Sequence, residues 1–313
     1  MKKRMILALA MLLLLVGCAN TSSNQGTTQS AERSSLRIGT MPALETFPIF
    51  IAYDQGFFED EGLTVYLERF FNPRDRDIAF QTDENIDGMT FDLVQLAVYQ
   101  EAGIDLVATT STIGLAALIG GEGVYEIADL QGLPVLMTSN TSMDYILDRA
   151  LTAGGLTMDD IITYEVPALP TRLEMLMHDQ AAAAILPDPF SAMALEAGYN
   201  LVTTTAELGI NPFVLAFRRE ITEEKLPELQ AFYRAMNRAV AFLNTADREE
   251  FIDALLETVG YPEHVRDTLP VPVFPPYVLP TAAVVQDVLD FVRVRGLLTR
   301  DIAVEDIIFD IGN

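Results

Sequence analysis

Residues 36–68 alternate a short apolar strand, a polar turn, a helix and a second strand. Pro42 pushes the residue before it towards an extended conformation, so the strand at 36–40 cannot continue directly into a helix. Residues 47–57 then carry apolar side chains at helical spacing. In an open α/β sheet, ligands bind outside the carboxyl ends of the strands, near helix N-termini. Residues 40–47 occupy that position, and we expect a binding site there.

The same alternation continues along most of the chain. Strands separated by helices of this length imply mainly parallel sheets that are covered on both faces. We expect strands at 36–40, 63–67, 86–90, 105–112, within 113–124, and at 133–137, 163–166, 181–186, 201–204 and 213–218. We expect helices at 47–57, within 72–83, at 91–102, 143–153, 171–180 and 190–197, and over most of the chain after 225, with a proline-rich break at 269–280.

The N-terminus indicates export. Three basic residues precede an apolar run at 5–16, which is too short to span a bilayer, and Gly17-Cys18 follows. This ending resembles a bacterial lipobox, so we expect residues 1–17 to be a signal peptide and Cys18, the only cysteine, to be lipidated. The alternative is an ordinary secretory signal with an incidental cysteine. Residues 18–35 are polar and small, as in a flexible tether between a membrane anchor and a folded body.

Composition excludes several classes of function. The net charge of −25 disfavours nucleic acid as a partner, because phosphate binding needs clustered Lys and Arg. No later segment is long and apolar enough to cross a membrane as a helix. The two histidines, His178 and His264, lie in polar surroundings, and no metal-ligand spacing, phosphate loop or nucleophile motif is present. We therefore expect no metal, no cofactor and no enzymatic activity.

Five short motifs, in order, carry a resemblance to a known family. They are GFFEDEGL at 56–63, DLQGLPV at 129–135, AILPDP at 184–189, PFVL at 212–215 and AMNRAVA at 235–241. With the lipobox, they resemble solute-binding proteins of ABC importers of the nitrate, sulfonate, taurine and thiamine-precursor type (the SsuA/THI5-like, or NMT1-like, family).

The resemblance implies a periplasmic-binding-protein type II fold of class α/β. Two lobes, each with a mainly parallel sheet, would be hinged by two crossovers near 109–113 and 208–212. Lobe one would comprise 36–112 and 211–313, and lobe two 113–210. The resemblance also implies a monomer outside the cytoplasm, lipid-anchored to the bacterial membrane, whose partners are an ABC permease with its cytoplasmic ATPase.

Strand ends and helix N-termini that face the gap between such lobes form the expected ligand site. Glu45 alternatively favours the helix dipole, one of residues 139–142 alternatively caps a helix, and Asp87 and Asp188 alternatively serve turns. Phe47, Phe190 and Tyr145 could stack on a flat ring or belong to the core. The expected ligand-binding residues are Thr40, Met41, Glu45, Phe47, Asp87, Thr90, Thr110, Ser139, Asn140, Thr141, Ser142, Asp188 and Phe190.

The charge of these segments indicates a class of ligand. They contain no Lys or Arg but three acidic residues, Glu45, Asp87 and Asp188, which favours a neutral or cationic nitrogenous ligand over a small anion. A heteroaromatic, thiamine-precursor-like compound is the leading expectation. The chain departs from thiamine-precursor binders, because it has no Trp and reads Met-Pro-Ala-Leu at 41–44. Sulfonate, taurine or nitrate is the alternative within the family, and a scaffold lipoprotein without transport function is the second alternative.

Overall fold

The computed structural model describes residues 34–312. The expected signal peptide, Cys18 and nearly all of the expected tether lie outside the described residues. Among the described residues, no helix combines the length and hydropathy that a membrane crossing requires.

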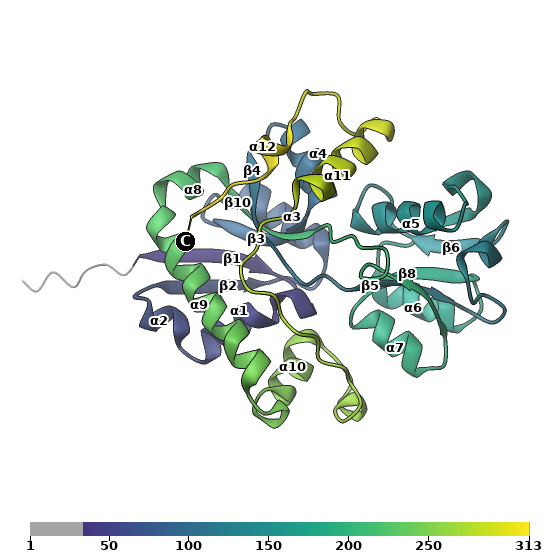
Figure 1. Ribbon diagram of the computed structural model, residues 1–313, viewed down its shortest axis with the longest axis horizontal. Helices are drawn as coiled ribbons and strands as arrows, with labels where there is room; N and C mark the ends of the chain where they lie inside the picture. The colour runs from purple at the N-terminus through teal and green to yellow at the C-terminus, as the bar shows by residue number, and fades with distance from the viewer. Residues whose placement is uncertain (1–33, 313) are drawn as a thin grey trace, which may run out of the picture. The chain divides into compact units, whose positions relative to one another are not determined.

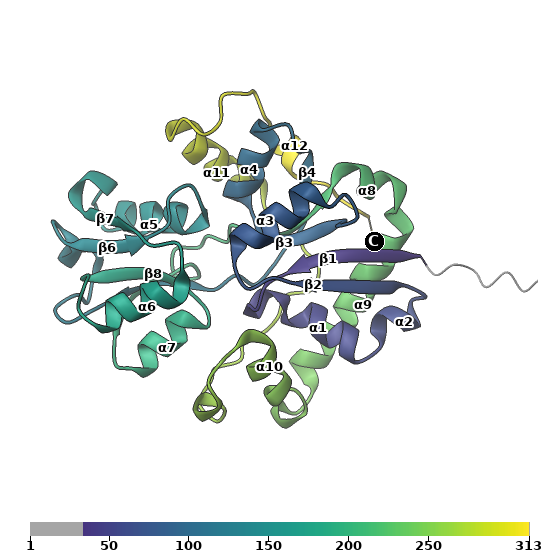
Figure 2. The same ribbon diagram turned by 180° about the vertical axis from the view of Figure 1, so that it is seen from behind.

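A first five-stranded sheet has the strand order β2-β1-β3-β10-β4 (Figures 1 and 2). β1 pairs in parallel with β2 and β3, whereas β10 lies antiparallel between β3 and β4. The strands are β1 (Ser35–Thr40), β2 (Thr64–Arg69), β3 (Gly88–Asp92), β4 (Leu106–Ser111) and β10 (Phe213–Arg218). Four strands therefore run one way and the inserted β10 runs the other.

A second sheet repeats this plan with the order β7-β6-β8-β5-β9. β6 pairs in parallel with β7 and β8, and β5 lies antiparallel between β8 and β9. The strands are β5 (Ala116–Gly120), β6 (Pro134–Met137), β7 (Ile162–Glu165), β8 (Ala183–Pro187) and β9 (Asn200–Thr204). The expected α/β fold with two mainly parallel sheets is confirmed.

Helices cover both faces of each sheet (Figure 1). The α-helices are α1 (Phe47–Asp54), α2 (Phe57–Asp60), α3 (Pro73–Thr82), α4 (Leu93–Glu101), α5 (Ser142–Ala153), α6 (Leu169–Met177), α7 (Phe190–Glu196), α8 (Arg219–Glu224), α9 (Leu226–Thr245), α10 (Ile252–Val259), α11 (Ala282–Val294) and α12 (Val304–Ile307). Short 3-10 helices are η1 (Leu44–Thr46), η2 (Ile127–Leu130), η3 (Met158–Asp160), η4 (Arg248–Glu250) and η5 (Glu263–Val265).

The cores follow the two-residue period of the strands. In β10, Val214 and Ala216 face the core under α4 and α11, whereas Leu215 and Phe217 face the core under α1 and α9. Both faces of β10 are apolar because helices bury both, as its unbroken apolar run predicts.

Two short connections join the sheets: residues 112–115 lead from β4 to β5, and residues 205–212 lead from β9 to β10. They touch each other, since the backbone N–H of Thr112 donates to the Phe213 carbonyl at 3.1 Å and Asn211 Nδ2 donates to the Thr112 carbonyl at 2.6 Å. A Cβ on Gly114 would overlap the Phe213 ring, so close approach of the two connections requires glycine there.

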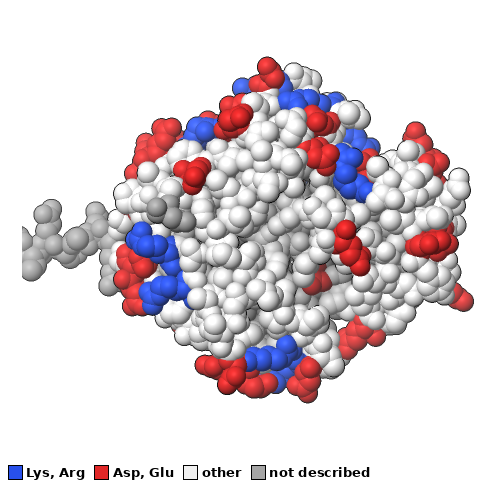
Figure 3. Space-filling view, in the orientation of Figure 1, with Lys and Arg blue, Asp and Glu red and all other residues white. Residues whose placement is uncertain are grey.

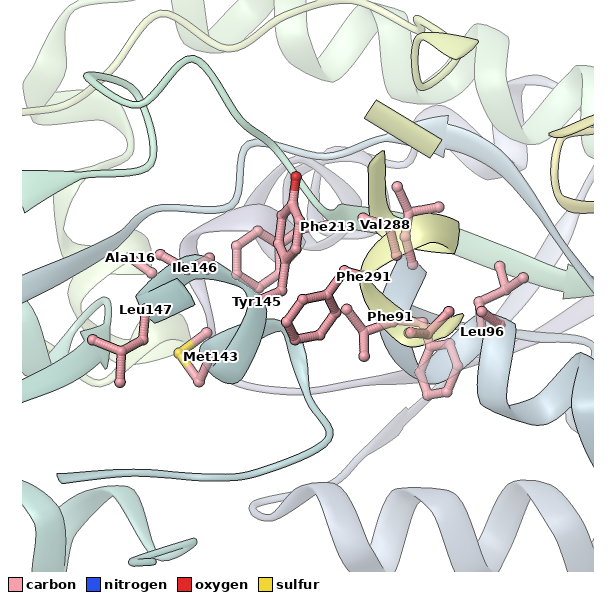
Figure 4. Close-up of a cluster of buried hydrophobic side chains, with 14 of the residues drawn as sticks. Phe91, Leu96, Ala116, Met143, Tyr145, Ile146, Leu147, Phe213, Val288 and Phe291 are labelled. Carbon is pink, nitrogen blue, oxygen red and sulfur yellow. The ribbon is translucent and has the colours of Figure 1, made fainter. Parts of the chain in front are cut away.

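Further contacts link the second sheet's helices to the C-terminal part of the chain. Tyr145 of α5 packs edge-on against Phe291 of α11 with ring centroids 5.5 Å apart (Figure 4). Its hydroxyl donates to Asp287 at 2.7 Å, and Arg149 Nε donates to the same carboxylate at 2.9 Å. Tyr145 is fully buried and belongs to this contact, so the expectation that it belongs to the core is confirmed.

Several expected elements differ from those observed at their ends, and two helices show the physical reason. The helix expected at 47–57 breaks into α1 and α2, because Gly56 adopts a left-handed conformation with φ 71°. The helix expected from residue 91 begins only at Leu93, because Phe91 belongs to β3 and Asp92 accepts a hydrogen bond from the N–H of Gln95 as the N-cap.

Gly114→Ala tests the contact between the two connections. The added methyl group must displace Phe213 or the backbone, which should lower the free energy of unfolding by about 2–3 kcal/mol in a urea titration. The control is Gly121→Ala, where the nearest atom to an added Cβ is the Ala182 carbonyl oxygen at 3.3 Å. Equal unfolding midpoints for the two variants would show that the connections separate without cost.

Candidate functional site

A pocket lies where the strands of the first sheet reach their carboxyl ends. Its cavity of about 30 Å³ is bounded by η1, the end of β4, α9 and the proline-rich segment 269–280, which we call the strap. The lining includes Glu45, Thr112, Tyr233, Asn237, Phe274 and Tyr277. We expected ligands to approach this edge of the sheet, and the structure has a cavity there.

Specific hydrogen bonds hold the strap over the end of β4. The Ser111 N–H and the Thr110 hydroxyl both donate to the Val278 carbonyl, at 2.7 and 3.0 Å. The Tyr277 N–H donates to Asn237 Oδ1 of α9 at 2.8 Å. Thr110, an expected site residue, thus lines the pocket and also anchors the strap.

Glu45 lines this pocket from η1. Burial raises the pKa of its carboxyl to about 7, against an ordinary 4.5; the charge of Arg76 opposes this rise and that of Asp92 adds to it. No hydrogen bond contributes to the shift. A desolvated carboxyl group that titrates near neutrality in a pocket is a typical sign of a functional site.

Arg76 of α3 carries the charge with the largest effect on the pKa of Glu45, and the residue is only 6% exposed. Its guanidinium group donates to Asp77 Oδ1 at 2.8 and 3.0 Å, to the Thr90 carbonyl at 2.9 Å and to Gln95 Oε1 at 3.2 Å. The guanidinium group also donates to the Met41 sulfur at 3.7 Å. All five N–H groups of the arginine are therefore engaged.

The residues that line the pocket include no Lys or Arg, and this arginine lies in α3, outside the segments expected at the site. The sequence predicted only a helix within the polar segment 72–83, where Arg and Asp alternate at 74–77. In the structure, α3 turns Arg76 inward against Phe91, with the guanidinium carbon 4.8 Å from the ring centroid. Asp92, whose pKa burial raises to about 6, and Asp77 offset its charge.

Asp87 was expected at the site, and the structure places it at the opposite edge of the sheet. It precedes β3, whereas ligands would approach the end of that strand. Its carboxylate accepts from the Arg37 N–H and from Lys225 Nζ, both at 2.8 Å. Asp87 therefore links β1 to Lys225, the residue between α8 and α9. The prediction was wrong because β3 ends at Asp92, so Asp87 lies before the first residue of the strand and not at its carboxyl end.

The other expected residues of the first sheet are not among those that line this pocket. Thr40 is buried at the end of β1, Thr90 is buried in the middle of β3, and Met41 contacts Arg76. Phe47 is fully buried in the core, with the ring centroids of Phe251 and Phe274 6.3 Å away, so its ring offers no face to a ligand.

Residues 139–142 follow β6 and start α5. Thr141 is the N-cap, since its hydroxyl accepts from the Met143 N–H at 3.2 Å, while the N–H and hydroxyl of Ser139 both donate to Glu165. Asn140 takes a left-handed conformation with φ 60°, and Ser142 is buried. Ser139, Asn140 and Thr141 therefore have local hydrogen-bond partners in the structure.

Asp188 and Phe190 follow β8, as the sequence predicts for this edge. Asp188 accepts hydrogen bonds from Ser191 and, at 3.1 Å, from the Tyr261 hydroxyl, and burial raises its pKa. Because Tyr261 follows α10, this bond brings the end of β8 against the part of the chain that covers the first sheet. Phe190 is partly buried against the core formed with α6.

Arg172 of α6 is a second buried cation that the sequence did not single out. It is 0% exposed and donates to the carbonyl groups of Val166 and Ile185 and to the Thr138 hydroxyl. Burial lowers its pKa to about 10. These bonds tie together three chain segments at the carboxyl ends of β6, β7 and β8.

Comparisons with known proteins agree with this architecture. The model of the NMT1-like family matches residues 29–259, so the chain belongs to the NMT1-like family, and the resemblance seen in the sequence is confirmed. A search of curated protein sequences gives no match.

Solved structures share the fold at low identity. The periplasmic aliphatic sulphonate binding protein SsuA from Escherichia coli has a TM-score of 0.74 at 21% identity, over 88% of this chain and 97% of that one. The alkanesulfonate-binding protein SsuA from Xanthomonas axonopodis pv. citri, bound to MOPS, has a TM-score of 0.73 at 22% identity, over 90% and 99%. The desulfurization enzyme DSZB has a TM-score of 0.67 at 11% identity, over 89% and 97%. The fold thus serves both binding proteins and an enzyme, and function must come from the site.

The raised pKa of Glu45 predicts a pH dependence of stability. Between its ordinary pKa of 4.5 and about 7, the folded state holds a proton that the unfolded state has released, so stability falls as pH rises through this window. Relative to Glu45→Gln, the wild-type free energy of unfolding should decrease by about 2–3 kcal/mol from pH 5 to pH 8. Urea titrations at both pH values measure this difference. Parallel pH profiles for the two proteins would contradict the desolvation of Glu45.

Proposed function

We propose that this member of the NMT1-like family is the extracytoplasmic solute-binding component of an ABC importer, and that it captures a small ligand between two lobes. The supporting observation is the pocket at the carboxyl ends of the first sheet, next to the connections that join the sheets. Aromatic walls with a few convergent polar groups and a carboxyl group of shifted pKa are typical of a ligand site.

We also propose the surroundings that such a protein needs. Lobe one comprises 36–112 with 211–313, and lobe two comprises 113–210, so that ligand binding closes one lobe against the other. Lipid on Cys18 holds the monomer at the outer side of the bacterial membrane. A permease with its cytoplasmic ATPase receives the ligand, and the protein itself catalyses no reaction.

For the ligand, we propose a small nitrogenous compound, with a thiamine-precursor-like heteroaromatic ring as the leading candidate. Three carboxyl groups, Glu45, Asp77 and Asp92, surround the one guanidinium group of Arg76. The segment 113–210 contains only Arg149 and Arg172 as basic residues, and in Figure 3 the surface on the right shows acidic side chains, with basic ones only at its boundary. This balance of charge favours neutral or cationic ligands over anions.

A sulfonate or a related anion is the second candidate. Two relatives in fold are named as sulfonate-binding proteins, and Arg76 supplies a cation close to the pocket. A bound anion would need Arg76 to exchange its bonds to Asp77 and Gln95 for bonds to the ligand.

A thermal-shift panel on residues 19–313 tests the proposal. The panel contains aminopyrimidines, thiamine, taurine, alkanesulfonates, nitrate and polyamines. A ligand at a hundred times its dissociation constant stabilises the protein by about 2.7 kcal/mol, which should raise the melting temperature by about 4–5 °C for a chain of this size.

We expect a shift with ring nitrogen compounds and none with the anions. A shift with sulfonates alone would establish the second candidate instead. No shift with any compound would contradict the solute-binding proposal for these ligand classes and would favour a scaffold lipoprotein.

A further inference from the structure

We propose that Glu45, Thr112 and Asn237 form a subsite for a cationic headgroup with several N–H donors, such as an ammonium or amidinium group. This inference rests on the proposed function, because it names the ligand chemistry of the same pocket. All three residues line one cavity, and each presents an oxygen that can accept a hydrogen bond.

Thr112 supplies an observation independent of Glu45. The residue is 8% exposed, and its hydroxyl oxygen is the buried side-chain polar atom without a hydrogen-bond partner among the described residues. A buried polar group left unpaired is costly, so natural proteins retain few of them. A ligand donor that reaches this oxygen would offset the cost only in the bound state.

Asn237 adds an oriented acceptor. Its Oδ1 accepts the Tyr277 N–H at 2.8 Å, which fixes the side-chain amide against the strap. A carbonyl oxygen has two lone pairs, so Oδ1 retains capacity for a second donor. The polar lining described here is therefore rich in acceptors, and the complementary ligand group is rich in donors.

The size and walls of the cavity agree with a small cation. About 30 Å³ holds one or two water molecules, so the pocket accepts a headgroup and leaves the rest of the ligand outside. Tyr233 and Tyr277 stand edge to face with ring centroids 4.7 Å apart, and both line the cavity. Aromatic faces attract ammonium and guanidinium groups.

Neighbouring charges leave the subsite acidic. Arg76 and Asp77 come from α3, Asp92 from the end of β3, Tyr233 from α9 and Tyr277 from the strap. Arg76 is paired with Asp77, and the pKa of Asp92 is raised to about 6, so Asp92 is mostly ionised above that pH. Ionised Glu45 then adds the charge that a cationic headgroup would neutralise.

Three probes with one ring and different headgroups test the subsite by calorimetric titration. Benzamidine carries a cation, benzamide is its neutral counterpart, and benzenesulfonate is an anion. We expect wild-type protein to bind benzamidine at least tenfold more tightly than either of the others. The affinity of wild-type protein for benzamidine should weaken as pH falls from 8 to 5, because the Glu45 carboxyl takes up a proton in this range. Burial raises the pKa of that carboxyl to about 7.

Two variants locate the interaction. Glu45→Gln should weaken benzamidine binding by about 10–100-fold and remove its pH dependence, because a charge-assisted hydrogen bond is lost. Thr112→Val should weaken it about tenfold while the melting temperature stays equal or rises, since the variant removes an unpaired hydroxyl. The control is Glu84→Gln, at an exposed residue outside the pocket, which should bind like wild type.

The outcomes separate the subsite from the transport function. Equal benzamidine binding by wild type and Glu45→Gln, or tighter binding of benzenesulfonate, overturns the subsite while a liganded importer protein remains. A Thr112→Val variant that melts lower and binds unchanged assigns the hydroxyl a structural role and also overturns it. If no probe binds, the subsite is refuted, and the thermal-shift panel decides the transport function separately.

Discussion

The return of the chain into its first sheet is the constraint that fixes where both connections leave that sheet. β10 is inserted antiparallel between β3 and β4, so its first residue, Phe213, pairs with Asp92 and adjoins the end of β4. Both connections to the second sheet must therefore leave from the carboxyl edge of the first. A cavity at that edge adjoins the only two backbone links of the described chain between the sheets, where relative movement of the sheets would be felt first.

Burial of the Glu45 carboxyl group at this edge lowers the stability of the folded protein. A rise in pKa from 4.5 to about 7 for Glu45 corresponds to about 3 kcal/mol of lost solvation, which is a large part of the 5–15 kcal/mol by which domains are stable. Glutamine has nearly the same shape and would avoid this cost. The cationic ligand proposed above would offset this cost in the bound state.

The sequence predicted the sheets well and the site only in part. β10 was predicted at its observed bounds, because a continuous apolar run bounded by Pro212 and charged residues indicates a strand buried on both faces. The strap was missed as a pocket wall, because its prolines give no periodicity and it meets Thr110 across a long sequence separation. Arg76 was missed because alternating charges indicate an exposed helix, and only the tertiary packing against Phe91 turns it inward.

The charged groups near the pocket say less about the ligand than the hydrogen-bond acceptors that lack a donor. Arg76 and Arg172 are the buried basic residues in the part of the chain that the structure describes, and their donors already serve Asp77, backbone carbonyls and the Thr138 hydroxyl. An anion would have to break these bonds before it gained any. The oxygen of Thr112, by contrast, has no partner among the described residues, and no hydrogen bond lowers the pKa of Glu45. Because unfilled acceptors can gain a donor without losing one, they point to a ligand that brings N–H groups.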